Sequence, residues 1–186
     1  RTVYVDDLTP PRIQLRGETE LDVEATTTYT DEGAVAYDNY DDGVSLTALI
    51  KTSSNVDLSK VGAYSVLYEV SDSRGNVAEV VKRTVNVVDT TRPVIELFGQ
   101  KVDFVDLNST YKDVGAFASD TLDGDITENI VVTDPVPQAI ANKEIGTFSV
   151  HYDVNDAAGN AAETVTRTVV VLSNDGKGPV IELLGD

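Results

Sequence analysis

The chain has 186 residues, with 14 Lys and Arg against 32 Asp and Glu, and a formal net charge of −18 at pH 7. Such a charge repels phosphate backbones and anionic lipid surfaces, so we expect no nucleic-acid partner. The chain has no Cys, which excludes disulfides, thiolate nucleophiles and zinc–sulfur sites. No stretch approaches the roughly 20 apolar residues of a membrane span, so we expect no membrane insertion in this segment.

The first element in chain order is a strand without a domain of its own. The sequence Arg-Thr-Val at residues 1–3 returns at 83–85 and again at 167–169. This spacing, roughly 80 residues, is the length of one small sandwich domain. We therefore expect residues 1–7 to be the last strand of a preceding repeat, and the parent protein to continue in both directions.

The first complete copy, residues 8–89, is a series of short strands separated by turns. A Pro-led strand at 11–17 comes first, because Pro can open a strand but not lie inside a central one. The motif Tyr-x-Asp-x-Gly-Ala follows at 29–34. Apolar residues at every second position of 62–70 then indicate a half-buried strand. The turn sequence at 72–76 predicts a hairpin between this strand and the last one.

The second complete copy, residues 90–173, repeats these elements in the same order, at 93–99, 111–116, 146–156, 156–160 and 167–171. Residues 174–186 read as a linker and the first strand of a following repeat. With about seven short strands per copy, the fold class is all-β. We predict two tandem immunoglobulin-like (Ig-like) domains, each an antiparallel Greek-key β-sandwich without the usual disulfide and Trp.

The order of these motifs resembles the bacterial immunoglobulin-like repeats that occur in tandem on surface proteins, adhesins and secreted enzymes. The resemblance covers nearly the whole chain and implies an extracellular or cell-surface location, although a fold alone names no activity. The first copy departs from the pattern in one loop. There Asp41-Asp42-Gly43-Val44-Ser45-Leu46-Thr47 replaces Asp123-Gly124-Asp125-Ile126-Thr127, so we expect this loop to differ between the copies.

Catalytic chemistry has little to build on in this sequence. The only His is His151, on the polar face of a predicted strand, and a Ser-His-Asp triad would have to use it. With 32 acidic residues, pairs of carboxylates come close to one another by chance. We expect no enzyme activity, no catalytic residues and no cofactor-binding residues other than metal ligands.

Sugar binding is an alternative, because exposed aromatic rings can stack on sugars. Tyr37 and Tyr40 flank an acidic loop in the first copy. Ser119 and Leu122 stand at the corresponding places in the second copy, which favours loop decoration over a shared sugar platform.

The acidic loops are the best candidates for a specific site. They are not EF-hands, since a loop starting at Asp38 would place Leu49 where a bidentate Glu is needed. In a Greek-key sandwich the loop after the second strand, the loop before the last strand and the incoming linker meet at one pole. Calcium accepts six to eight oxygen ligands from such sources, whereas local turn hydrogen bonding is the alternative explanation. The predicted metal ligands are Asp89, Asp120, Asp123, Asp125, Asp156 and Asn160 in the second copy and Asp6, Asp7, Asp38, Asp41, Asp42 and Asp72 in the first.

Two hypotheses of function follow from this sequence. The first is a non-catalytic structural or adhesive segment of a long extracellular bacterial surface protein, such as a stalk, an adhesin or a surface-layer building block, with calcium stiffening the junction between repeats. Its expected partners are neighbouring repeats of the same protein, other copies of itself or a surface glycan. The alternative is an accessory carbohydrate-binding module of a secreted enzyme. Flanking sequence discriminates between the two.

Overall fold

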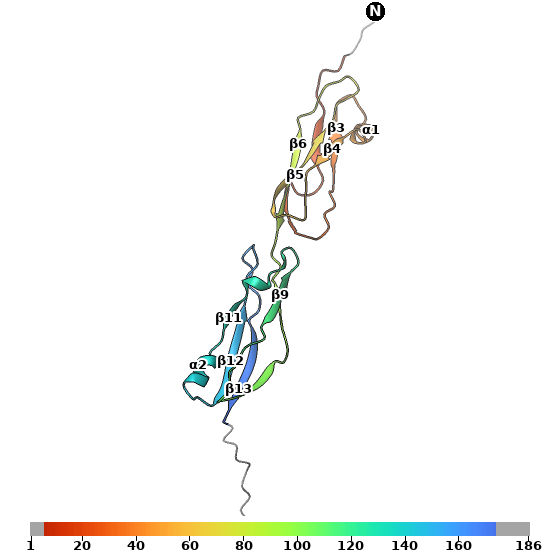
Figure 1. The fold of residues 1–186 in the computed structure, drawn as a ribbon. Helices are drawn as coiled ribbons and strands as arrows, with labels where there is room; N and C mark the ends of the chain where they lie inside the picture. Colours follow the sequence, from red (N-terminus) through yellow and green to blue (C-terminus); the bar gives the residue numbers. More distant parts are fainter. Residues whose placement is uncertain (1–5, 174–186) are drawn as a thin grey trace, which may run out of the picture. The chain divides into compact units, whose positions relative to one another are not determined.

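The computed structural model describes residues 6–173, and the chain divides into two units, Arg1–Thr90 and Thr91–Asp186. Both units are all-β apart from short helices, as Figure 1 shows. The predicted fold class, two tandem β-sandwich domains, is confirmed. The strand predicted over residues 1–7 lies outside the described residues except for Asp6 and Asp7, and the one predicted within 174–186 lies wholly outside them.

Unit 1 combines a two-stranded sheet with a four-stranded sheet. The smaller sheet pairs β1 with β3, and the larger has the order β2-β6-β5-β4. The elements in chain order are β1 (Arg12–Leu15), β2 (Glu20–Glu24), β3 (Ala34–Tyr37), α1 (Gly43–Thr47), β4 (Lys51–Ser54), β5 (Gly62–Glu69) and β6 (Val81–Val88).

Unit 2 repeats this plan with one additional short strand. Its sheets have the orders β7-β9-β10 and β8-β13-β12-β11. The elements are β7 (Val94–Leu97), β8 (Val102–Asp106), β9 (Ala116–Asp120), β10 (Gly124–Asp125), the 3₁₀ helix η1 (Thr127–Asn129), β11 (Val131–Thr133), α2 (Val136–Ala141), β12 (Gly146–Asp153) and β13 (Val165–Leu172). The loop expected to differ between the copies does so, because it forms α1 in unit 1 but β10 and η1 in unit 2.

The predicted hairpin forms the centre of the larger sheet in each unit. Strand β5 runs antiparallel to β6, and β12 runs antiparallel to β13. Alternation along β5 buries Val66 and Tyr68, and the same alternation along β12 buries Val150 and Tyr152. Each unit therefore has its own hydrophobic core between its two sheets.

One feature of the strand pairing differs from the prediction of purely antiparallel sandwiches. Strand β2 lies parallel to β6, and β8 lies parallel to β13. The reason is that the chain leaves the smaller sheet after β1 and joins the edge of the larger one. The turn at this crossing uses Gly17 in unit 1 and Gly99 in unit 2, with φ of +68° and +71°, a conformation that glycine adopts without steric cost.

Among the described residues, no helix is long and apolar enough to cross a membrane.

Candidate functional site

Four aspartates from separate parts of unit 1 lie together, and we call Asp7, Asp38, Asp41 and Asp72 the unit 1 aspartate cluster. Each offers a carboxylate oxygen, and these oxygens all lie within 4.8 Å of one another. Asp7 precedes β1, Asp38 and Asp41 follow β3, and Asp72 lies between β5 and β6. The topology thus brings three distant segments of the chain to one end of the unit.

The loop after β3 is shaped by the side chain of Asp38. Its Oδ2 accepts hydrogen bonds from the backbone N–H groups of Tyr40, at 2.8 Å, and Asp41, at 3.0 Å. Asx turns of this kind are favoured because a short carboxylate can bind its own backbone two residues further on. Asp41 Oδ2 in turn accepts from the backbone N–H of Ser73 at 2.9 Å, which joins this loop to the one between β5 and β6.

Asp72 organises the turn between β5 and β6. Its Oδ1 accepts from the backbone N–H groups of Arg74 and Asn76, and its Oδ2 accepts from Asn76 Nδ2 at 2.7 Å. Burial by itself would raise the pKa of Asp72, but these hydrogen bonds, with those of the Asn76 side chain foremost, hold the pKa below its ordinary value. The carboxylate is therefore ionised at neutral pH.

Asp7 is the most buried member of the cluster, with a relative exposure of 6%. Its Oδ1 accepts from the backbone N–H of Thr9 at 3.1 Å and from Asn39 Nδ2 at 3.3 Å. Its backbone carbonyl accepts from Asn76 Nδ2 at 3.0 Å. The buried Oδ2 has no hydrogen-bond partner among the described residues, and the same is true of Asp38 Oδ1.

The concentration of charge in the cluster is unfavourable. Two unit charges 4.8 Å apart, the upper limit on the separation of these carboxylate oxygens, repel by about 3 kcal/mol at an effective dielectric of about 20. The charge of Arg74 acts on Asp41, while its guanidinium lies over the Tyr40 ring, 5.3 Å from the centroid, and donates to the Tyr40 hydroxyl. One positive charge offsets only part of the charge of four carboxylates. The cluster therefore has the chemistry of a site for a hard cation, which takes oxygen ligands.

Unit 2 builds the corresponding loops in the same way. Asp120 Oδ1 accepts from the backbone N–H groups of Leu122 and Asp123, and Asp123 Oδ2 accepts from that of Ala157 at 2.7 Å. Asp156 accepts from the backbone and side chain of Asn160. The carboxylates of Asp123 and Asp156 offer oxygens within 4.8 Å of each other, and the buried Asp120 Oδ2 has no hydrogen-bond partner among the described residues.

The other predicted ligands are not among the clustered aspartates described above. Asp42 Oδ2 accepts from the backbone N–H of Ser45 and caps α1. Asp125 accepts from the backbone N–H of Thr127, and Asp6 is exposed. The Asn160 side chain donates a hydrogen bond to the Asp156 carboxylate in the turn between β12 and β13. Asp89 belongs to the segment before β7 and holds the place in the repeat that Asp7 holds in unit 1, so its role as a ligand stays a prediction.

The two other candidate sites of the sequence have ordinary surroundings. His151 Nδ1 lies 3.3 Å from Thr166 Oγ1 on the neighbouring strand. Tyr37 and Tyr40 are each about half exposed, at 54% and 53%. The Arg74 guanidinium lies over one face of the Tyr40 ring.

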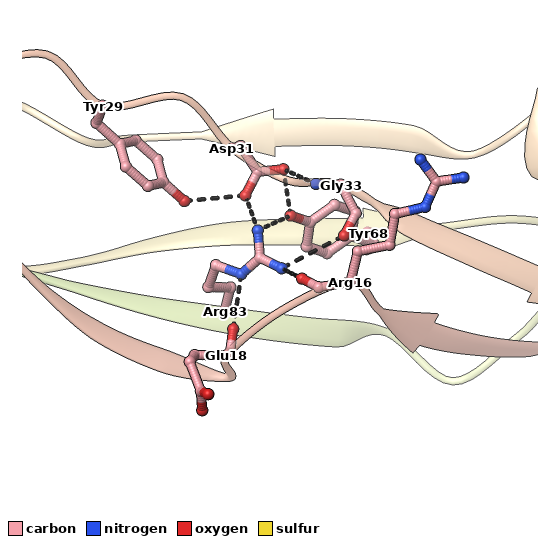
Figure 2. Close-up of polar contacts among 7 residues, drawn as sticks. All are labelled: Arg16, Glu18, Tyr29, Asp31, Gly33, Tyr68 and Arg83. Carbon is pink, nitrogen blue, oxygen red and sulfur yellow. Dashed lines mark hydrogen bonds and ion pairs between the residues drawn. The ribbon is translucent and has the colours of Figure 1, made fainter.

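A buried arginine at the centre of each sandwich is the feature that sequence reasoning missed. Arg83 on β6 is 2% exposed, and Figure 2 shows its guanidinium surrounded by acceptors. Its Nε donates to the Glu18 carbonyl at 2.9 Å, and Nη2 donates to the Arg16 and Gly33 carbonyls. Arg83 thereby joins the larger sheet to the segment that crosses between the sheets.

Asp31 provides the countercharge of this network. It pairs with Arg83 Nη1 and accepts hydrogen bonds from the hydroxyls of Tyr29, at 2.9 Å, and Tyr68. Its Oδ2 also accepts from the Gly33 backbone N–H at 2.9 Å. The Tyr-x-Asp-x-Gly motif is thus one hydrogen-bonded unit (Figure 2).

Unit 2 contains a similar network, but Arg167 Nε has no hydrogen-bond partner among the described residues, whereas Arg83 Nε donates to the Glu18 carbonyl. Arg167, which is fully buried, pairs with Asp113 at 2.8 Å, and its Nη2 donates to the carbonyls of Phe98 and Gly115. Asp113 also accepts from the hydroxyls of Tyr111 and Tyr152. The available signal was the position of the arginine, since Arg83 falls on the same face of its strand as the buried Val85 and Val87.

The network predicts an acid-dependent loss of stability. Burial would raise the pKa of Asp31, but hydrogen bonds from Tyr68 and Tyr29 and the charge of Arg83 together lower it below its ordinary value of 3.8. A depressed pKa contributes stability that is present above pH 3.8 and is lost as the pH falls through the folded-state value. The advantage of the wild type over Asp31→Asn in urea unfolding should be constant near neutral pH and shrink below pH 3.8. A constant advantage down to pH 2 would contradict this assignment of charge.

The two units belong to one family. Residues 13–87 and 95–171 each match the bacterial surface protein Ig-like domain family. These ranges include most of the chain, so the chain belongs to this family, as two copies in tandem. The tandem bacterial Ig-like repeats indicated by the motifs are thereby confirmed.

Several known proteins contain similar segments. The chain is 28% identical to hyalin of Strongylocentrotus purpuratus over 182 residues, 97% of this chain and 15% of that protein. It is 32% identical to pesticidal crystal protein Cry22Aa of Bacillus thuringiensis over 164 residues, 83% of this chain and 22% of that protein. A solved structure of the M60 catalytic domain with the CBM51-1 and CBM51-2 domains from Clostridium perfringens ZmpB aligns with 91% of this chain and 31% of that one, at 16% identity and a TM-score of 0.43. The chain thus spans less than a quarter of the length of the two relatives.

Proposed function

We propose that the chain is a non-catalytic structural segment of a longer extracellular surface protein, in which tandem units space other parts of the molecule from the cell. One observation carries this proposal: the same self-contained unit is built twice, each time with its own core and its own buried arginine network. The family, whose members are surface protein domains, supports the same role.

Calcium stiffening is the finer part of the proposed function. The aspartate loops occur in both units with matching hydrogen bonds, which supports a shared purpose beyond local turn formation. Bound calcium would hold the segment that leads into a unit against that unit's end loops. A row of such units would then resist bending more strongly when calcium is present.

The location is testable without knowing any ligand. Antibodies against residues 1–186 should label intact cells of the source organism, and permeabilising the cells should add little signal. Labelling that appears only after permeabilisation would contradict the proposed function, whatever the behaviour of calcium.

The alternative, an accessory carbohydrate-binding module, draws support from one surface feature. Tyr37 lines an open groove together with Arg16 and Asp42. An aromatic ring beside charged hydrogen-bonding groups is a common arrangement in sugar sites. Specific binding to a glycan array that Tyr37→Ala abolishes would favour this alternative over a purely structural role.

A further inference from the structure

We propose that the unit 1 aspartate cluster is a calcium site that fastens the segment before β1 to the end loops of unit 1. The inference deepens the calcium part of the proposed function and rests on it for its biological purpose. It does not depend on where the protein is displayed, so antibody labelling and cation binding can fail separately.

The geometry of the cluster suits one ion. Calcium binds oxygens at 2.3–2.6 Å, so two of its ligands lie at most about 5 Å apart. The four carboxylates already offer oxygens within 4.8 Å of one another. Turn hydrogen bonds hold the carboxylates of Asp38 and Asp72 in place, and a hydrogen bond to Ser73 holds that of Asp41. The site is therefore organised before an ion arrives.

The buried carboxylate of Asp7 points independently to a cation. Asp7 is 94% buried, and its Oδ2 has no hydrogen-bond partner among the described residues. An ionised oxygen in such a place is costly unless a positive charge meets it. Asp38 Oδ1 is also buried without a partner in the described part of the chain. A cation between these carboxylates would satisfy both oxygens.

The ligand type favours calcium among common metal ions. All four side chains are carboxylates, which suit hard cations rather than zinc or copper. They come from three segments with irregular backbone, and calcium tolerates variable coordination of six to eight oxygens. Magnesium requires a near-ideal octahedron and gives up its water reluctantly.

The consequence concerns the segment that leads into the unit. Asp7 lies five residues before the start of β1, at Arg12, and contacts the rest of the unit through Asn39 and Asn76. One ion coordinated by all four carboxylates would link Asp7 to Asp38, Asp41 and Asp72. Calcium would thereby reduce the opening of residues 6–11 and increase the stability of unit 1 by mass action.

A matched pair of neighbouring variants tests the site in the full chain. Asp41→Asn removes one charge from the cluster while its amide oxygen can still accept the Ser73 hydrogen bond. Asp42→Asn removes the same charge one residue away, outside the cluster, and Asn is an equally good helix N-cap. Calcium titration by calorimetry should show affinity at this site about 10-fold or more weaker for Asp41→Asn and nearly unchanged for Asp42→Asn.

Hydrogen exchange measures protection residue by residue, so calcium bound by unit 2 cannot be mistaken for calcium bound at the unit 1 aspartate cluster. Millimolar calcium should slow amide exchange at residues 6–9 and 72–76 but not at β4, and Asp41→Asn should abolish this protection. Urea unfolding without calcium shows whether Asp41→Asn is folded. If it is not, Asp38→Asn replaces it in the test. Three results would each overturn the proposal: no protection, equal weakening by Asp42→Asn, or the same protection from NaCl or magnesium at equal ionic strength.

Discussion

Arg83→Met should lower the unfolding free energy of unit 1 by about 3–5 kcal/mol and leave unit 2 folded. The substitution removes the guanidinium donors to Asp31, to the Tyr68 hydroxyl and to the carbonyls of Glu18 and Arg16. Because small domains have only about 5–15 kcal/mol of stability, unit 1 should unfold at a much lower urea concentration than unit 2.

Urea unfolding followed by hydrogen exchange assigns the early transition to one unit. Lys82→Met is the matched control, since Lys82 is exposed and precedes Arg83 in the same strand. A loss of less than about 1 kcal/mol for Arg83→Met, as for a surface ion pair, would show that the network contributes little.

The second large effect is the loss of unfolding free energy when the aspartate that pairs with the buried arginine is removed, in each unit in turn. Asp31→Ala and Asp113→Ala should each cost a few kcal/mol, on the order of 3–5, because a buried arginine loses its countercharge. The cost should be smaller in unit 2. There Asp103 lies 3.7 Å from Arg167 Nη1 and can take over part of the pairing, whereas Leu21 occupies the corresponding place in unit 1.

Thermal or urea unfolding of both variants measures this difference, with Lys112→Ala as the exposed neighbouring control. The double variant Asp103→Asn/Asp113→Ala should bring the loss in unit 2 up to that of Asp31→Ala. Equal losses in the two single variants would mean that Asp103 does not compensate.

The fold could be predicted because its strongest signals are local and occur twice. Alternation in β5 and β12 correctly placed Val66, Tyr68, Val150 and Tyr152 in the cores. The parallel pairing of β2 with β6 could not be seen, because it depends on where the chain crosses between sheets after Gly17. That crossing is fixed by tertiary contacts, among them those of Arg83.

The sequence predicted a set of candidate ligands in the acidic loops, but not which of them lie close together in unit 1. The sequence cannot distinguish Asp41 from Asp42, because the choice depends on which of them caps α1. It likewise cannot distinguish Asp123 from Asp125, which accepts a hydrogen bond at the start of η1. The buried arginines were used only as markers of the repeat, because charged residues are rarely fully buried unless they are paired.

If the chain consists of two self-contained units in series, single-molecule stretching between its termini should show this directly. Each unit should unfold in its own step and release roughly 75–80 residues, about 270 Å when fully extended. Arg83→Met should lower the force of one step and leave the other unchanged. A single step that releases both units together would show that the units do not unfold independently.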